Sequence, residues 1–409
     1  MISLPAAVFS ISLRKDIVIL LLATLLLLAG NGLLETSVSY RTSLLSQSSL
    51  LTGIIMACYY SGFLVGSWYG PSLLKKFSHQ AYLGVAAFFF TLAISLLGSV
   101  HLATAVALLQ FFCGLCIASI YVTVESYINS RSCSNSRGRY FSYYMAVWYI
   151  GVGCGQLPLL FNSGFYSHFF YVAACLAVLA FVPWFFWKPV QAYRSKSQKL
   201  FESSAEINFV GLLSLDPKPY FVSLISGLMI GVLFGMGPAF GEQFFSNSYT
   251  TSKMILAFVI GALLMQLALT LAARYWESSR LLLMLSCVGV LAVISCVWVT
   301  RTATGTNNFI NLLLPSLMLG ASCLPVYSLA VALAQDKVQH SSPITASALM
   351  LLCNGLGSII GPILAGYCMQ HWGHHSFYVS LLLCHLLLML CFLGVATRKK
   401  LSSLSIGSA

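Results

Sequence analysis

Long, almost uncharged apolar runs recur along this chain and restrict its fold more than any other feature. The run 281–299, for example, contains no Asp, Glu, Lys or Arg. Only 7% of the 409 residues are charged and 59% are hydrophobic, whereas soluble domains carry roughly 25% charged residues. A helix of about 20 apolar residues crosses the hydrocarbon core of a bilayer. The sequence therefore predicts an all-α membrane protein that crosses the lipid bilayer many times.

Polar interruptions divide the apolar stretches into twelve predicted spans. Each is long enough to cross the bilayer as a helix. The predicted spans are 17–38, 48–74, 81–99, 103–129, 140–162, 168–187, 221–245, 253–273, 281–300, 309–334, 345–369 and 377–396.

The positions of the basic residues predict the orientation of these spans. Lys and Arg close to span ends are retained on the cytoplasmic side of a membrane. With the N-terminus in the cytoplasm, the 21 Lys and Arg residues all fall on that side except Arg41, Lys253 and Arg301. Both termini are therefore expected in the cytoplasm. The same bias accounts for the net charge of +12, so no nucleic-acid partner is expected.

One long polar segment divides the chain in the middle. Residues 188–220 contain both acids and bases and have six predicted spans on each side. We expect an N-terminal six-helix bundle at 1–187, a cytoplasmic linker at 188–220 and a C-terminal six-helix bundle at 221–409.

The two halves also resemble each other in sequence. Gly114 and Tyr121 recur about 205 residues later as Gly320 and Tyr327. Glycines of the first span recur in the seventh at a similar distance, and glycines and a proline of the fifth recur in the eleventh. This pattern is typical of transporters built from a duplicated unit.

Several short motifs carry a resemblance to a known family. They are Glu-Ser-Tyr-Ile-Asn at 125–129, Arg-Gly-Arg at 137–139, Gly-Gln at 155–156, Leu-Pro-Val-Tyr-Ser-Leu at 324–329 and Gly-Pro-Ile-Leu-Ala-Gly at 361–366. Together with the twelve spans and the duplication, they resemble the major facilitator superfamily, in particular the YcaD-like branch of bacterial inner-membrane permeases. The resemblance implies two pseudo-symmetric six-helix bundles, a small-molecule substrate, a multi-pass location in the inner membrane and a monomer without a cofactor.

Three positions depart from the usual pattern of that superfamily. Lys75 stands where the loop between the second and third spans usually has an acid, and Gln110 stands where many proton-coupled members have an arginine. Gln156 interrupts the Gly-Pro signature of the fifth span. These departures weaken the inference of a standard proton/drug antiport mechanism and leave the fold inference intact.

Glu125 is the acid nearest the cytoplasmic end of the fourth span. It lies about 33 Å along the helix at 1.5 Å per residue, and the hydrocarbon core is about 30 Å thick. Glu125 is therefore expected at the cytoplasmic edge, next to a basic loop. We expect a cytoplasmic gate formed by Glu125 with Lys75, Lys76, Arg137 and Arg139. A proton-linked role and a purely topological role are the alternatives.

Three further acids are candidates for ion or proton coupling. Glu35 and Glu242 are expected toward the outer ends of the first and seventh spans, and Asp336 follows the tenth. The alternative for Glu35 and Glu242 is interfacial anchoring, with Arg41 or Lys253 as partner.

Neutral polar side chains are the candidates for a substrate cavity. Amides and aromatic groups within apolar walls suit an uncharged or amphiphilic ligand. An interhelical hydrogen bond is the alternative for each. The candidates are Asn31, Gln110, Tyr121, Gln156, Gln266, Tyr327 and Asn354.

Two groups of histidines have structural interpretations. His385 lies inside the twelfth span, where a packing role is favoured. His371, His374 and His375 have no nearby acid or cysteine to complete a zinc site, so no metal is expected.

These features favour a secondary transporter that moves a small molecule by alternating access, with proton-coupled efflux as the first expectation. An uptake permease or facilitator is an alternative, and a membrane receptor that does not transport is a competitor from another class. No HExxH, GxSxG or GxxxxGK[ST] motif supports an enzyme or an ATP-driven pump.

Overall fold

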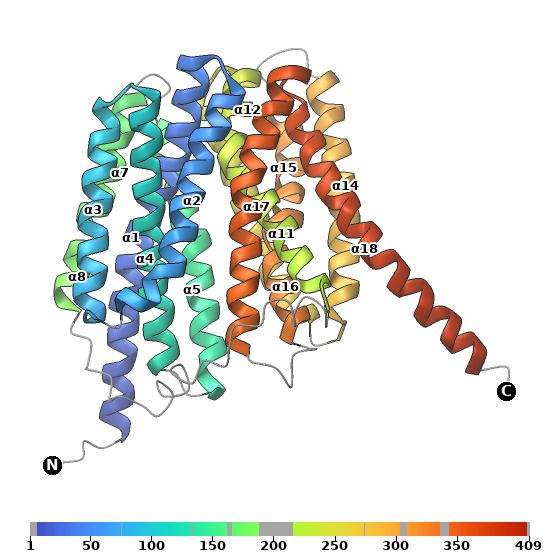
Figure 1. Ribbon diagram of the computed structural model, residues 1–409, viewed down its shortest axis with the longest axis horizontal. Coiled ribbons are helices and arrows are strands. Elements are labelled where there is room, and N and C mark those ends of the chain that lie inside the picture. The colour runs from blue at the N-terminus through green and yellow to red at the C-terminus, as the bar shows by residue number, and fades with distance from the viewer. Residues whose placement is uncertain are drawn as a thin grey trace. The chain divides into compact units, whose positions relative to one another are not determined.

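The computed structural model describes residues 6–74, 76–131, 134–161, 166–187, 216–273, 275–302, 309–335 and 343–406, and every structural statement concerns these residues. Helices are the only regular secondary structure among the described residues (Figure 1). Side chains are described for 15–74, 76–128, 143–161, 168–187, 216–273, 275–302, 311–334 and 349–393.

The first compact unit comprises Met1–Val38 and Cys58–Ile207. In it, α3 packs against both α4 and α7. Its helices, two of which continue into the second unit, are α1 (Ala6–Ser46), α2 (Ser49–Leu74), α3 (His79–Ser99), α4 (Ala103–Arg131), α5 (Ser134–Cys154), α6 (Leu157–Phe161), α7 (Tyr166–Leu179) and α8 (Phe181–Phe186).

The second compact unit comprises Ser39–Ala57 and Asn208–Ala409. In it, α11 packs along α17, and α13 packs along α15. Its remaining helices are α11 (Lys218–Ile230), the π-helix η1 (Gly231–Met236), α12 (Gly237–Phe245), α13 (Ser248–Ala272), α14 (Ser278–Thr302), α15 (Phe309–Cys323), α16 (Val326–Gln335), α17 (Pro343–Trp372) and α18 (Ser376–Ile406).

Twelve segments of the described chain are long and apolar enough to cross a membrane. The predicted all-α architecture with twelve spans is confirmed. The bundle boundaries at 187 and 220 stay a prediction, because 188–215 lies outside the described residues.

The end of the first span was predicted wrongly. The sequence suggested an end at residue 38, whereas α1 continues to Ser46. The added turns contain many polar residues, and a hydropathy analysis predicts that such residues face water. Ser39, Arg41 and Ser43 are nevertheless buried. Other helices, not water, surround these side chains; the Ser39 hydroxyl, for example, donates a hydrogen bond of 2.6 Å to the carbonyl of Gly235.

Matched glycines bring helices into close contact in each unit. A Cβ atom at Gly114 of α4 would overlap the carbonyl of Tyr59 on α2, and one at Gly320 of α15 would overlap the backbone of Phe258 on α13. Small residues allow helix backbones to approach closely where apolar burial gives little driving force. The repeated sequence positions thus make the same kind of contact in both units.

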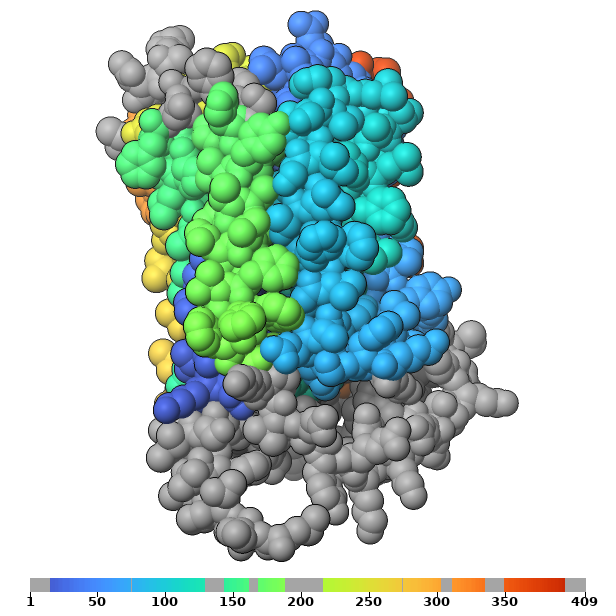
Figure 2. All heavy atoms as spheres, turned by 90° about the vertical axis from the view of Figure 1, so that its left-hand side faces the viewer, coloured from blue at the N-terminus to red at the C-terminus, as the bar shows by residue number. Residues whose placement is uncertain are grey.

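The outer face of α3 is apolar. Val85, Phe89, Leu92 and Leu96 recur at helical spacing and are exposed, and Figure 2 shows the face that α3 and α7 share. An exposed apolar stripe is typical of a helix that faces lipid.

Candidate functional site

An amide and a carboxyl group share one face of α1 in the first unit. Asn31 and Glu35 are four residues apart, and the Asn31 Nδ2 atom donates a hydrogen bond of 2.6 Å to Oε1 of Glu35. The Tyr59 hydroxyl of α2 donates to Oδ1 of Asn31 at 3.0 Å. Asn31 thus has a hydrogen-bond partner on each side.

Glu35 is the one partly exposed residue within 27–43; every other residue there is buried. Because α1 continues to Ser46, the acid lies about 16 Å of helix before that end. The expectation that Glu35 lies toward the outer end of its membrane span stays a prediction, because α1 has 41 residues and is longer than the roughly 30 Å hydrocarbon core.

Two neighbouring tyrosines of α2 lie close to the Glu35 carboxyl group. The Tyr59 and Tyr60 rings meet edge to face with centroids 5.3 Å apart, and both side chains interact with Glu35. The Tyr60 hydroxyl is buried and has no hydrogen-bond partner of regular geometry among the described residues. Its interaction is with the Glu35 carboxyl group.

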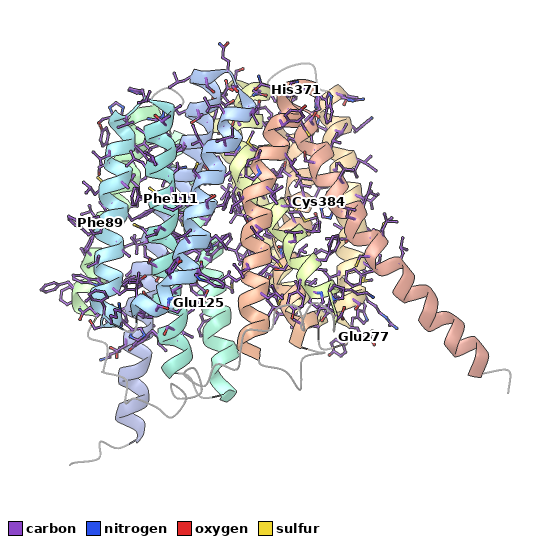
Figure 3. The ribbon with its side chains drawn as sticks, in the orientation of Figure 1. Phe89, Phe111, Glu125, Glu277, His371 and Cys384 are labelled. Carbon is purple, nitrogen blue, oxygen red and sulfur yellow. The ribbon has the colours of Figure 1, made fainter. Side chains whose placement is uncertain are left out.

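A second polar face lies on α4. Tyr121 and Glu125 are four residues apart and both are partly exposed. The Trp148 Nε1 atom of α5 donates a hydrogen bond of 2.6 Å to the Tyr121 hydroxyl, and Tyr144 bonds to Glu125. Figure 3 labels Glu125 on α4.

Tyr121 is a neighbour of both acids. It interacts electrostatically with both Glu35 and Glu125. Its ring meets Phe63 at 5.5 Å and Tyr144 at 6.4 Å, in both cases edge to face. Both carboxyl groups of the first unit therefore lie near aromatic side chains.

The predicted cytoplasmic gate is only partly visible. Lys76 is exposed, whereas Lys75 and the side chains of Arg137 and Arg139 lie outside the described parts of the chain. Next to Glu125, Ser126 lies 3.3 Å from Nε2 of His79. The gate itself stays a prediction.

The remaining cavity candidates of the first unit are buried. Gln156 accepts a hydrogen bond of 3.0 Å from the Thr36 hydroxyl and donates one of 3.1 Å to the Gly32 carbonyl. Gln110 is fully buried on α4. Gln156 thus connects α1 to the end of α5, the kind of interhelical bond that was the alternative for this residue.

The cavity candidates of the second unit are partly exposed. The Ser328 hydroxyl donates to Oε1 of Gln266 at 3.2 Å, and Nδ2 of Asn354 donates to the Ser223 carbonyl at 3.2 Å. Tyr327 is half-buried on α16. A role of these residues in binding substrate stays a prediction.

Glu242 has neutral partners in the second unit. Its Oε2 atom accepts a hydrogen bond of 2.9 Å from the Ser43 hydroxyl. The adjacent Gln243 donates to Ser49 at 2.8 Å, so α12 is bonded to the 39–57 segment. Lys253 instead places its Nζ atom 3.9 Å from the centre of the Tyr249 ring. Asp336 lies outside the described residues.

His385 is fully buried in the second unit. Its Nε2 atom lies 3.3 Å from the Ser322 hydroxyl and 3.4 Å from the Cys323 sulfur, and its ring packs on Gly289 of α14. Within the described chain, no three His, Cys, Asp or Glu side chains are arranged to hold a metal ion.

Comparison with known proteins decides the family. The model of the Major Facilitator Superfamily matches residues 20–343 and 220–407 of this chain. The chain belongs to the Major Facilitator Superfamily. The MFS-type transporter YcaD of Salmonella paratyphi B is 27% identical over 377 residues, covering 87% of this chain and 91% of that protein. YcaD of Salmonella arizonae is 26% identical over 366 residues, with the same coverage of both chains.

Solved structures of the superfamily share the fold. The nucleoside transporter NupG has a TM-score of 0.69 at 15% identity, covering 93% of this chain and 98% of that chain. A D-xylose-proton symporter has a TM-score of 0.69 at 13% identity, covering 92% and 97%. The chain is therefore a multi-pass membrane transporter of the YcaD-like branch with bacterial relatives, and not an enzyme.

Some residues of the candidate site around Glu35 and Glu125 were not predicted from the sequence. Tyr59, Tyr60 and Phe63 lie in an apolar span where one sequence does not reveal the inward face. A signal was present in Gly62 and Gly66, because glycines four residues apart mark the face of α2 that packs on α4.

Proposed function

We propose that this protein is a proton-coupled secondary transporter that exports a small amphiphilic molecule across the bacterial inner membrane by alternating access. The observation that carries the proposal is Glu35. This acid lies away from both ends of α1, keeps partial exposure within a buried stretch, and has neutral partners.

A carboxyl group within an apolar helix is costly and is usually retained for function. The described partners of Glu35 are an amide and tyrosine hydroxyls. These neutral groups can hydrogen-bond to the Glu35 carboxyl group whether or not it carries a proton. Protonation of Glu35 therefore changes the net charge of the site by one unit. A substrate that senses this charge becomes coupled to the proton by reciprocal linkage.

The cytoplasmic gate completes the proposal. Glu125 lies three residues before the end of the apolar segment 103–128 of α4. Lys76 is exposed and lies three residues before His79, which is 3.3 Å from Ser126. We propose that both termini are cytoplasmic and that Glu125 pairs with Lys75, Lys76, Arg137 and Arg139 when the cytoplasmic side closes. Glu242 and Asp336 are kept as secondary coupling candidates.

Proteoliposomes with an imposed pH gradient test the coupling. We expect substrate flux driven by an inward proton gradient for the wild-type protein, and gradient-independent flux for Glu35→Gln. Glu277→Gln is the control, since it removes an exposed carboxyl group just before α14 in the second unit. Equal gradient dependence in wild type and Glu35→Gln would remove Glu35 from the coupling mechanism.

The direction of the response separates export from its competitors. Co-directional movement of substrate with protons contradicts export and supports an uptake permease. Equilibration without any gradient dependence supports a facilitator. Substrate binding without flux supports a receptor.

A further inference from the structure

We propose that Glu35, Tyr60 and the aromatic side chains around Tyr121 form a binding site for a lipophilic monovalent organic cation. This inference rests on the proposed function and names the substrate class of the same site. Its elements are α1, α2, α4 and α5 of the first unit.

The charge of the site favours a cation. Glu35 is partly exposed, and no Lys or Arg side chain among the described residues of the first unit forms an ion pair with it. The titratable groups that face it are Tyr59 and Tyr60 of α2 and Tyr121 of α4, all neutral as phenols. The next acid, Glu125, adds negative potential from beyond Tyr121. A positive ligand is thus attracted to an otherwise uncompensated carboxylate.

The Tyr60 hydroxyl is a second polar group of the site, and its interaction is with Glu35. It is about nine-tenths buried, at 7% exposure, and has no hydrogen-bond partner of regular geometry among the described residues. Buried hydroxyl groups are normally bonded. Because the group lies close to Glu35, a ligand that neutralises the acid would be held beside an available donor.

The rings around the acid favour an organic cation over an inorganic ion. Phe63, Tyr121 and Trp148 are partly exposed, and Tyr121 is fixed by the 2.6 Å bond from Trp148. Aromatic faces attract cations and bury apolar ligand surface at the same time. Hard metal ions instead need about six or more oxygen ligands. Among the described residues, no three His, Cys, Asp or Glu side chains are arranged to hold a metal ion.

Competition for Glu35 explains how such a site couples to protons. A proton and an organic cation each neutralise the same carboxylate, so binding of one weakens binding of the other. Bound cation therefore leaves the site as a proton enters. This is the stoichiometric exchange that an exporter needs.

Equilibrium binding of radiolabelled tetraphenylphosphonium to the full-length protein in detergent tests the proposal. We expect saturable binding near pH 8. Tetraphenylborate, which has the same shape and the opposite charge, should not compete. Glu35→Gln should weaken binding about tenfold or more, equivalent to about 1.4 kcal/mol, and Tyr60→Phe by a few-fold.

Three controls keep the result interpretable. Glu277→Gln, which removes an exposed acid of the second unit, should bind like wild type. Glu35→Asp should recover part of the affinity by keeping the charge, and thermal unfolding reports whether Glu35→Gln is folded. Equal affinity of folded Glu35→Gln and wild type would overturn the proposal, as would equal competition by tetraphenylborate. Gradient-driven flux of another compound without tetraphenylphosphonium binding would overturn the substrate class alone and leave the proposed function intact.

Discussion

The two units share backbone contacts but differ in where their charges lie. Gly114 and Gly320 make matched helix contacts. The first unit places Glu35 and Glu125 within helices, beside aromatic groups. The described acids of the second unit lie at helix ends: Asp216 precedes α11, Glu242 lies in the last turn of α12, and Glu277 precedes α14. Among the described residues, the two units thus share these glycine contacts but differ in where their acidic side chains lie.

The largest expected effect tests the shared packing. Gly114→Val and Gly320→Val should both destabilise strongly, because each side chain would overlap a neighbouring backbone. Overpacking of this kind costs about 1–3 kcal/mol or more. Thermal unfolding of the purified variants measures it, with lipid-facing Leu108→Ala and Leu264→Ala as controls. A large loss in one glycine variant alone would show that the contacts are not equivalent.

The next effect tests the difference in chemistry at one repeated position. Tyr121→Phe removes the hydroxyl that accepts a hydrogen bond from Trp148 and interacts with Glu35. We expect the transport rate to fall about tenfold, which corresponds to the loss of one hydrogen bond that involves a charged group. Tyr327→Phe alters the matching residue of the second unit and should change transport less than about twofold. Initial rates in proteoliposomes measure both. The reverse order would assign the chemistry to the second unit.

A further effect on stability concerns the buried histidine of the second unit. Gly289→Ala would place a methyl group against the His385 ring and should cost about 1–3 kcal/mol. Adding His385→Ala removes the obstructing ring and should restore part of the stability in the double variant. Unfolding curves of the two single variants and the double variant give the interaction energy. Purely additive effects would contradict the proposed packing role.

The smallest effect concerns histidines outside the spans. Burial lowers the pKa of His374, and burial, with His374 and Arg301 nearby, lowers the pKa of His375. The rings that pack against them are Phe240 and Phe244. The unfolded chain thus binds more protons, so stability should fall as pH drops below about 6.5.

Thermal unfolding between about pH 7.5 and pH 5.5 measures this loss of stability. His374→Gln combined with His375→Gln should make the pH dependence shallower. His101→Gln serves as the control, since this histidine is exposed in the first unit. An unchanged slope in the double variant would exclude the pair as its source.

Hydropathy and charge were sufficient to predict the fold. The twelve spans follow from apolar length, and the duplication was visible in repeated glycines. The end of α1 was missed because Ser39, Arg41 and Ser43 are buried against protein, and hydropathy does not distinguish such a surface from water.

The site was predicted less completely. Asn31, Tyr121, Glu35 and Glu125 were recognised because polar groups in apolar helices are conspicuous. Their partners Tyr59 and Tyr60 were not, since tyrosines in a span fit lipid interfaces and helix contacts equally well. Which amides serve packing also depends on three-dimensional contacts, as the bonds of Gln156 to Thr36 and Gly32 illustrate.

Proton release on ligand binding tests the central claim most directly. Tetraphenylphosphonium is added to weakly buffered purified protein, near the pH at which half of the Glu35 carboxyl groups carry a proton. We predict release of a fraction of a proton per cation bound by the wild-type protein, varying with pH, and none for folded Glu35→Gln. Equal release by both proteins, or binding without any release across the pH range, would contradict the assignment of Glu35 as the shared site.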